Sequence, residues 1–197
     1  MRNIILAPLL FLFSLSGVAH AQARLAVSLL SFSGGELEHD DSGQDFDFSG
    51  SSFAYGSGLS LGYRFAGDFE AGLSLAFQST ELGESESSLD IVGVYGTYYF
   101  AGSSAQQEKG LSWFVKAAAA TGSSDNGAVE SDLSSFGVFG GPELKLSDEV
   151  SLSAQAGYTH QTLEIADVEI AGGVFGGGLF LHVTLPVSFD TNAKKKN

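Results

Sequence analysis

The chain contains no cysteine and only three prolines. The absence of cysteine excludes disulfide frameworks and thiolate metal sites. Because proline is scarce and glycine is frequent, with 26 residues, the composition favours closely packed strands with many turns over long helices. After residue 21, no stretch approaches the roughly 20 uninterrupted apolar residues of a membrane helix, so any membrane-spanning segment must be a strand.

Positive charge is also scarce. The sequence has 9 lysines and arginines against 23 acidic residues, a formal net charge of −14. The acids gather in four polar segments that contain no lysine or arginine: Glu36, Glu38, Asp40, Asp41, Asp45 and Asp47; Glu81, Glu84 and Glu86; Asp125, Glu130 and Asp132; Glu164, Asp167 and Glu169. Such surfaces repel nucleic acid, whose binding requires basic residues, so a nucleic-acid partner is excluded.

The N-terminus has the pattern of a cleavable export signal. Arg2 precedes an apolar run over residues 4–15, and the small-residue site Ala19-His20-Ala21 follows it. We therefore expect a signal peptide at 1–21, one domain at 22–189 and a short polar tail at 190–197. The tail carries Lys194, Lys195 and Lys196 and is interpreted as a solvated end.

Eight segments of about ten residues alternate between large apolar and small or polar residues. The alternation is clear at 53–65, 69–78, 111–117, 150–158 and 178–189, and weaker near 24–32, 89–100 and 135–146. Short connectors (66–68, 101–110 and 147–149) alternate with long ones (33–51, 79–88, 123–134 and 162–172). This pattern predicts an all-β fold: an eight-stranded, antiparallel, up-and-down transmembrane β-barrel.

The large residues could face lipid, or they could fill the core of a soluble lipocalin-like barrel. Lipid is favoured because the opposite face is mostly Gly, Ser and Ala, with too few charges for a water-exposed surface. Aromatics also recur eight to twelve residues apart on one face, which projects to roughly 20 to 30 Å along the barrel axis and brackets the ~25 Å apolar band of such barrels. The predicted interface aromatics are Phe53, Tyr55, Tyr63, Phe65, Phe69, Phe77, Trp113, Tyr158 and Phe189.

With its signal peptide, its alternation, its loop pattern and its final segment 179–189, the chain resembles the small eight-stranded outer-membrane barrels of Gram-negative bacteria. These are the OmpA-transmembrane-domain and OmpX-like surface-antigen group. The resemblance implies a monomer in the bacterial outer membrane with both termini in the periplasm. It also implies contacts with outer-membrane lipids and lipopolysaccharide, and acidic outer loops that can meet an extracellular ligand.

An eight-stranded barrel is filled by its own side chains, so no open pore is expected. The polar residues predicted to point inward are Arg64, Glu70, Lys116, Glu143, Lys145, Gln155 and His182. The turn at 66–68 would set Arg64 opposite Glu70 as an ion pair, and Lys116 with Glu143 is a second candidate pair. We interpret the network as a means of satisfying buried polarity, with a gate or proton path as the alternative.

The first acidic segment is a candidate divalent-cation loop. Glu36, Glu38, Asp40, Asp41, Asp45 and Asp47 supply hard oxygen ligands for Ca²⁺ or Mg²⁺, but they match no known calcium-loop motif. A solvated acidic loop is the preferred interpretation, with divalent ions as a possible bridge to lipopolysaccharide. No cofactor is predicted.

Catalytic signals are weak. The domain has three histidines, His39, His160 and His182. A small barrel that deacylates lipid A uses a histidine followed two positions later by serine, whereas here Thr162 follows His160. The glycines at 172–178 precede no helix, so they predict no phosphate cradle. The sequence therefore predicts a non-catalytic structural or surface-interaction role; the alternatives are a lipid A-modifying enzyme and a narrow ion channel.

Overall fold

The computed structural model describes residues 22–39, 45–52, 58–65, 68–82, 85–101, 110–125, 130–165 and 168–185. The predicted signal peptide and tail lie outside these ranges. So do Asp40, Asp41, Phe53, Tyr55 and Phe189. Among the described residues, no helix is long and apolar enough to cross a membrane.

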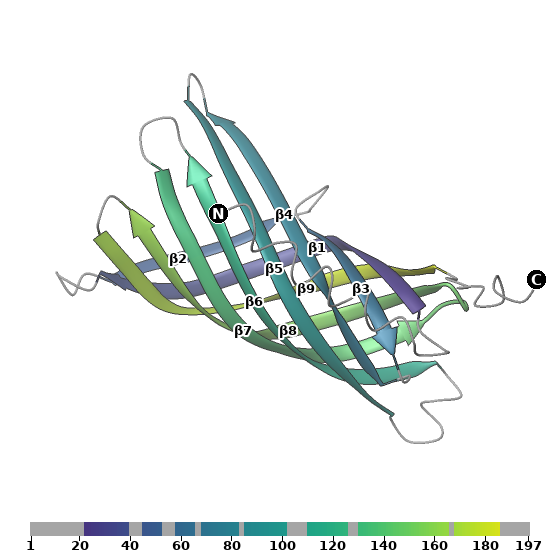
Figure 1. The fold of residues 1–197 in the computed structure, drawn as a ribbon. Coiled ribbons are helices and arrows are strands. Elements are labelled where there is room, and N and C mark those ends of the chain that lie inside the picture. The colour runs from purple at the N-terminus through teal and green to yellow at the C-terminus, as the bar shows by residue number, and fades with distance from the viewer. Residues whose placement is uncertain are drawn as a thin grey trace, which may run out of the picture.

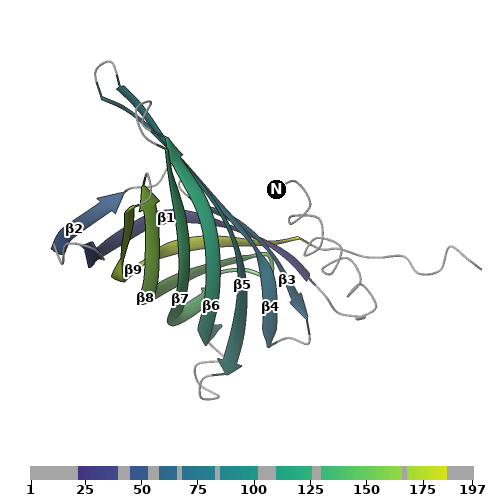
Figure 2. The same ribbon diagram turned by 60° about the vertical axis from the view of Figure 1, so that its left-hand side comes forward.

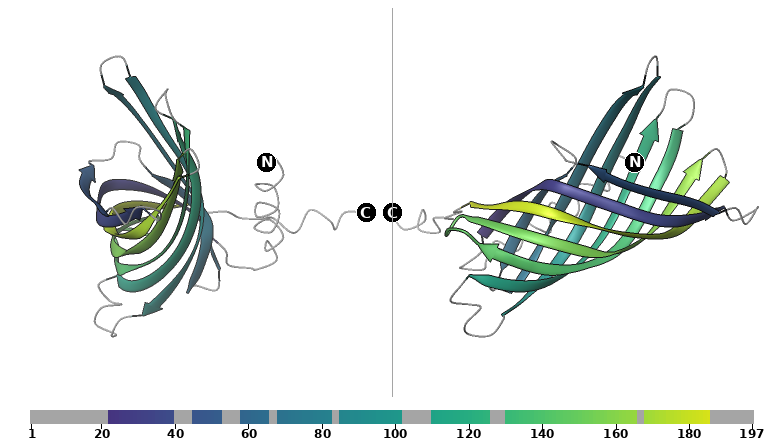
Figure 3. Two further views of the ribbon diagram at one scale, coloured as in Figure 1. Left: turned by 90° about the vertical axis from the view of Figure 1, so that its left-hand side faces the viewer. Right: turned by 180° about the vertical axis from the view of Figure 1, so that it is seen from behind.

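Within these described ranges, nine antiparallel strands form one sheet (Figure 1). They are β1 (Gln22–His39), β2 (Asp45–Ser52), β3 (Leu59–Phe65), β4 (Phe69–Leu82), β5 (Ser85–Ala101), β6 (Leu111–Asp125), β7 (Glu130–Lys145), β8 (Val150–Ile165) and β9 (Val168–Leu185). One edge of β1 pairs with β9, and the other pairs first with β3 and then with β2. Strands β2 and β3 thus share one position, and the β1–β9 pairing closes an eight-stranded barrel (Figure 3). This confirms the predicted fold.

The four long connectors are largely strand. Ile165 of β8 pairs with Val168 of β9, and Leu82 of β4 pairs with Ser85 of β5. Most residues of the predicted long connectors therefore belong to the strands, and the hairpins continue well beyond the barrel, most of all β4–β5 (Figure 2). Outside an apolar band both faces of a hairpin meet water, so the alternation that marks a strand in the sequence disappears while the backbone hydrogen bonds continue.

The large apolar residues face outward, as the sequence predicts. Leu59 and Leu61 are 41% and 53% exposed, whereas Gly62 and Gly72 on the opposite face are buried. Strand β1 alternates less cleanly because its pairing with β9 shifts between Ser28 and Leu30, a β-bulge that moves the inward positions by one residue.

Strand β5 hides its alternation for a different reason. Tyr95 and Tyr99 point inward and are only 6% and 4% exposed, whereas Tyr98 points outward and is 55% exposed. Aromatics on both faces of one strand remove the contrast that a sequence pattern relies on. The inward hydroxyls both bind the carboxylate of Glu70.

Outward aromatics gather at two levels. Near the short turns lie Tyr63, Phe65, Phe69, Tyr98, Phe100 and Trp113, with the Phe65 and Phe69 ring centroids 4.9 Å apart across the turn. Toward the hairpins lie Phe32, Phe136, Tyr158 and Phe175, with Phe32 and Phe175 6.3 Å apart. The side chain of Phe77 lies outside the description.

Glycine at position 72 makes room for the interior. A Cβ there would lie 2.6 Å from the Tyr95 ring and against the backbone oxygen of Leu61. Gly72→Ala is expected to lower the free energy of unfolding by about 1–3 kcal/mol because the ring and the backbone must both move. Urea unfolding of the detergent-folded protein, followed by gel mobility, measures the change.

Gly96→Ala is the matched control, because its Cβ would meet only the Phe69 ring, at an ordinary 3.5 Å. Equal loss of stability in both variants would contradict the packing argument.

Candidate functional site: a charged layer inside the barrel

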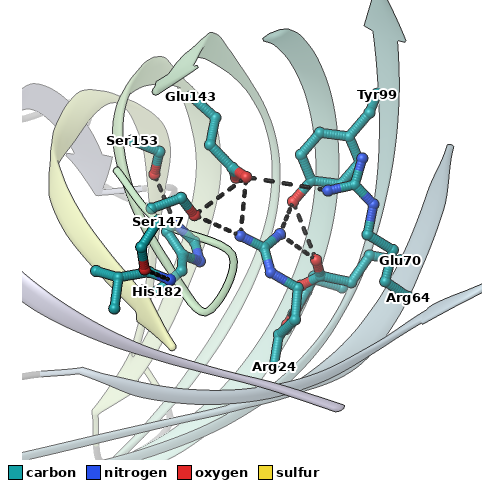
Figure 4. A network of polar contacts seen from close by, with 11 residues as sticks. Arg24, Arg64, Glu70, Tyr99, Glu143, Ser147, Ser153 and His182 are labelled. Atoms are coloured by element: carbon teal, nitrogen blue, oxygen red, sulfur yellow. Dashed lines mark hydrogen bonds and ion pairs between the residues drawn. The ribbon is translucent and has the colours of Figure 1, made fainter. Parts of the chain in front are cut away.

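One arginine organises the interior. Arg24 is 3% exposed and donates four hydrogen bonds to groups on four other strands (Figure 4). Its Nη1 lies 2.7 Å from Glu70 Oε2 and 2.6 Å from the Tyr99 hydroxyl. Its Nη2 lies 2.9 Å from both Glu143 Oε1 and Ser151 Oγ. A single guanidinium thus joins β1 to β4, β5, β7 and β8.

The two carboxylates in this layer receive further donors. Tyr95 donates to Glu70 Oε1 at 2.8 Å, and Tyr99 donates to Glu70 Oε2 at 3.0 Å. Ser151 donates to Glu143 Oε1 at 3.2 Å. Since buried charge is costly unless it is paired and hydrogen-bonded, these donors make the ion pairs tolerable inside the barrel. We call Arg24, Glu70, Tyr99, Glu143 and Ser151 the Arg24 layer.

Arg24 was missed in the sequence analysis. It comes three residues after the predicted cleavage site, in a strand whose bulge blurs the alternation. The available signal was the short run of inward positions Arg24, Ala26 and Ser28, which faces the opposite way from Leu25 and Val27.

The predicted register of Arg64 opposite Glu70 is confirmed. Glu70, however, takes its ion pair from Arg24. The guanidinium of Arg64 stacks 3.9 Å above the Tyr99 ring centroid, and its Nη1 lies 4.0 Å from Glu143 Oε1. The pairing of β3 with β4 therefore sets Arg64 opposite Glu70 as predicted, but Arg24 on β1 is the cation that binds Glu70.

Two details of the predicted network are wrong. Lys116 pairs in register with Phe139 and not with Glu143, which lies opposite Ser112, and its ammonium instead sits 4.5 Å from the Tyr95 ring centroid. Lys145 lies at the short-turn rim, with a side chain that is 55% exposed, because it is the last residue of β7.

Lys145 binds Asp148 at 2.8 Å across the turn between β7 and β8. This hydrogen bond, together with the positive charge of Lys145, lowers the pKa of the Asp148 carboxyl below its ordinary value. The pair belongs to the solvated rim and not to the Arg24 layer.

Two cavities border the layer. A cavity of about 380 Å³ lies at the short-turn end, and a void of about 20 Å³, near the volume that holds one water, lies on the other side. Tyr99 and Glu143 line both, so the layer separates them. Gln155 and His182 also line the small void, where His182 Nε2 lies 2.7 Å from Ser153 Oγ.

The candidate cation loop is only partly described. Glu36 is exposed, whereas the side chains of Glu38, Asp45 and Asp47 lie outside the description. In the part of the chain that the structure covers, no group of three or more histidine or acidic side chains could hold a metal ion. The loop site stays a prediction.

No family model and no curated protein matches the chain. Similar solved structures include Neisserial surface protein A, at 15% identity over 84% of this chain and 99% of that chain, with a TM-score of 0.48. Ail, the attachment invasion locus protein of Yersinia pestis, is 11% identical over 82% of this chain and 99% of that chain, with a TM-score of 0.38. The outer membrane protease OmpT from Escherichia coli is 8% identical over 84% of this chain and 96% of that chain, with a TM-score of 0.36. The closed, eight-stranded antiparallel barrel formed by the described strands itself confirms the predicted fold class.

Replacing Arg24 tests the layer. Arg24→Met leaves Glu70 and Glu143 without their shared cation and is expected to cost about 3–5 kcal/mol of stability, because unpaired buried carboxylates remain. The loss should appear as a lower temperature of the heat-induced shift in gel mobility.

Lys145→Met removes an equal charge from the solvated rim and should leave that temperature nearly unchanged. If the two variants melted alike, the Arg24 layer would not be the stabilising element.

Proposed function

We propose that the protein is a non-catalytic barrel of the bacterial outer membrane, with both termini in the periplasm and acidic hairpins at the cell surface. The observation that carries this proposal is the outward face: a belt of exposed apolar residues around a closed barrel, bordered by aromatics at both levels. On β9, the ten residue-to-residue rises from Phe175 to Leu185 project to about 25 Å at the tilt usual for such barrels, close to the height of their apolar band. The export-signal pattern supports the same location.

The hairpins continue this outer surface with carboxylates. Asp132 pairs with Glu164, which in turn pairs with Glu169, and all three side chains are exposed. We call Asp132, Glu164 and Glu169 the hairpin row. It lies beyond Tyr158 along β8, at the level expected for lipid headgroups. Like charges directly opposite one another are destabilising, and no lysine or arginine is present in the hairpins.

Divalent cations shared with lipid phosphates would relieve this repulsion. Such ions take six or more oxygen ligands and commonly complete their shells from phosphates and water. The protein would then bind lipopolysaccharide through cation bridges, which stabilise the outer leaflet and keep the hairpins upright for contact with a surface ligand. A fully self-contained metal site is not required.

Charge removal tests this bridge. In bilayers that contain lipopolysaccharide, EDTA should lower the unfolding temperature of the wild type, and added Ca²⁺ should restore it. The triple variant Asp132→Asn, Glu164→Gln, Glu169→Gln should have lost most of this dependence, because the bridging carboxylates are gone.

The control triple variant Asp68→Asn, Asp148→Asn, Glu149→Gln removes the same charge at the opposite rim and should respond to EDTA like the wild type. Equal EDTA responses in the two triple variants would reject the hairpin row as the cation-binding surface.

A lipid A-modifying enzyme is the second candidate, because His160 is exposed on the outer face, with Thr162 two positions along the same strand. A nucleophile requires an adjacent base, and threonine replaces the serine of the deacylating barrel. We expect purified protein incubated with lipid A to give no product lighter by one acyl chain in mass spectrometry. A product absent from His160→Ala would establish the enzymatic alternative.

A further inference from the structure

Large apolar residues change sides in the hairpins. Within the barrel they face outward. In the hairpins, Leu133, Leu163 and Ile170 pair in register across β7, β8 and β9, and each adjoins a residue of the hairpin row in sequence. Since the hairpin row is exposed on the outer face, and successive residues of a strand point to opposite faces, these three apolar side chains point inward. The hairpins are therefore apolar inside and acidic outside.

The inward apolar positions continue across two further strands. Leu133 pairs with Gly122 of β6, which in turn pairs with Ile91 of β5. A Cβ at Gly122 would lie 3.0 Å from Ile91 Cγ1, so the isoleucine covers the glycine and keeps the surface apolar. We call Ile91, Leu133, Leu163 and Ile170 the inner apolar row. With neighbouring strands about 4.8 Å apart, the row spans roughly 19 Å of the inner wall, which is long enough for an alkyl chain.

The inner apolar row is partly open to solvent. Its four side chains are half-buried, whereas Val174, the next large inward residue of β9 toward the barrel, is only 3% exposed. Close packing of the interior is thus complete at Val174 and incomplete at the level of the row. Covering apolar surface that meets water is favourable, so the row gains free energy from contact with an apolar molecule.

Charge selects among apolar molecules. The last described pair of the β8–β9 hairpin is Ile165 with Val168, and each of them directly adjoins an acid of the hairpin row. Because one residue of a strand rises about 3.3 Å, these carboxylates lie within a Debye length, about 8 Å at physiological salt, of the hairpin end. They attract a cation to that place and repel an anion from it.

We propose that the hairpin end of the barrel binds a cationic amphiphile, a molecule with an alkyl chain and an ammonium head. The alkyl chain lies along the inner apolar row, and the ammonium lies at the hairpin ends, where the hairpin row attracts it. The same carboxylates disfavour an anionic amphiphile of equal chain length. The site goes beyond the lipopolysaccharide bridge, because it uses the inner face of the hairpins and requires no lipid phosphate.

The absence of cysteine allows a single label inside the hairpins. Gln161 is the inward residue next to Leu163 toward the barrel, and Thr162 between them lies on the outer face. Bimane attached to Gln161→Cys reports on the inner face, and bimane on Thr162→Cys is the matched control for partition into lipid. Each protein, in phosphatidylcholine nanodiscs without lipopolysaccharide or divalent cations, is titrated with dodecyltrimethylammonium, dodecanol or dodecyl sulfate below the micellar concentration.

We expect dodecyltrimethylammonium to change the emission of the Gln161→Cys label saturably and that of the Thr162→Cys label far less. Adding Leu163→Asn and Ile170→Asn should weaken this binding about tenfold, because apolar contact is lost. Adding Asp132→Asn, Glu164→Gln and Glu169→Gln should remove the preference for the cation over dodecyl sulfate.

An affinity for dodecanol or dodecyl sulfate equal to that for the ammonium would overturn the proposal. So would unchanged binding in the asparagine variant, or equal responses of the two labels. The heat-induced shift in gel mobility verifies that each variant is folded. Because no lipopolysaccharide is present, failure of this site leaves the EDTA test of the cation bridge unaffected.

Discussion

The bridge between Arg24 and two carboxylates on different strands is the interaction on which the interior depends. Glu70 on β4 and Glu143 on β7 would repel each other in a narrow barrel, and one guanidinium from β1 neutralises both. The three strands are far apart in sequence, so the bridge forms only after the sheet has closed. A buried ion pair of this kind contributes specificity of arrangement as much as stability, because its geometry is correct in only one register.

Space for this layer comes from residues that lack side chains. Tyr95 reaches Glu70 by lying over Gly62 and Gly72, where any Cβ would collide with it. The small residues of the inner face are therefore not a sign of an empty channel. They make the room that a few long side chains occupy, which is how a barrel of eight strands is both narrow and polar inside.

The sequence was sufficient for the barrel, the outward apolar face and the position of Arg64 opposite Glu70. Alternation and turn length determine those features locally. The sequence was insufficient for the role of Arg24, because a bulge near Ser28 blurs the alternation of its strand. It was also insufficient for the pairing of Lys116 with Phe139 and for the rim position of Lys145, because these depend on the register between strands. The hairpin lengths were missed since backbone pairing outside an apolar band leaves no periodic signal.

The distribution of charge gives the molecule two different ends. The described lysines and arginines all lie in the interior or at the short-turn rim: Arg24, Arg64, Lys116 and Lys145. The charged residues of the hairpin segments are all acidic. Among the described residues, interior charge is largely compensated within the chain, whereas the sequence places no lysine or arginine in the hairpin segments to compensate their carboxylates. In the proposed cation bridge, compensation at the hairpins comes from outside the protein. A surface charge of this kind is screened by salt far more than the buried ion pairs of the Arg24 layer.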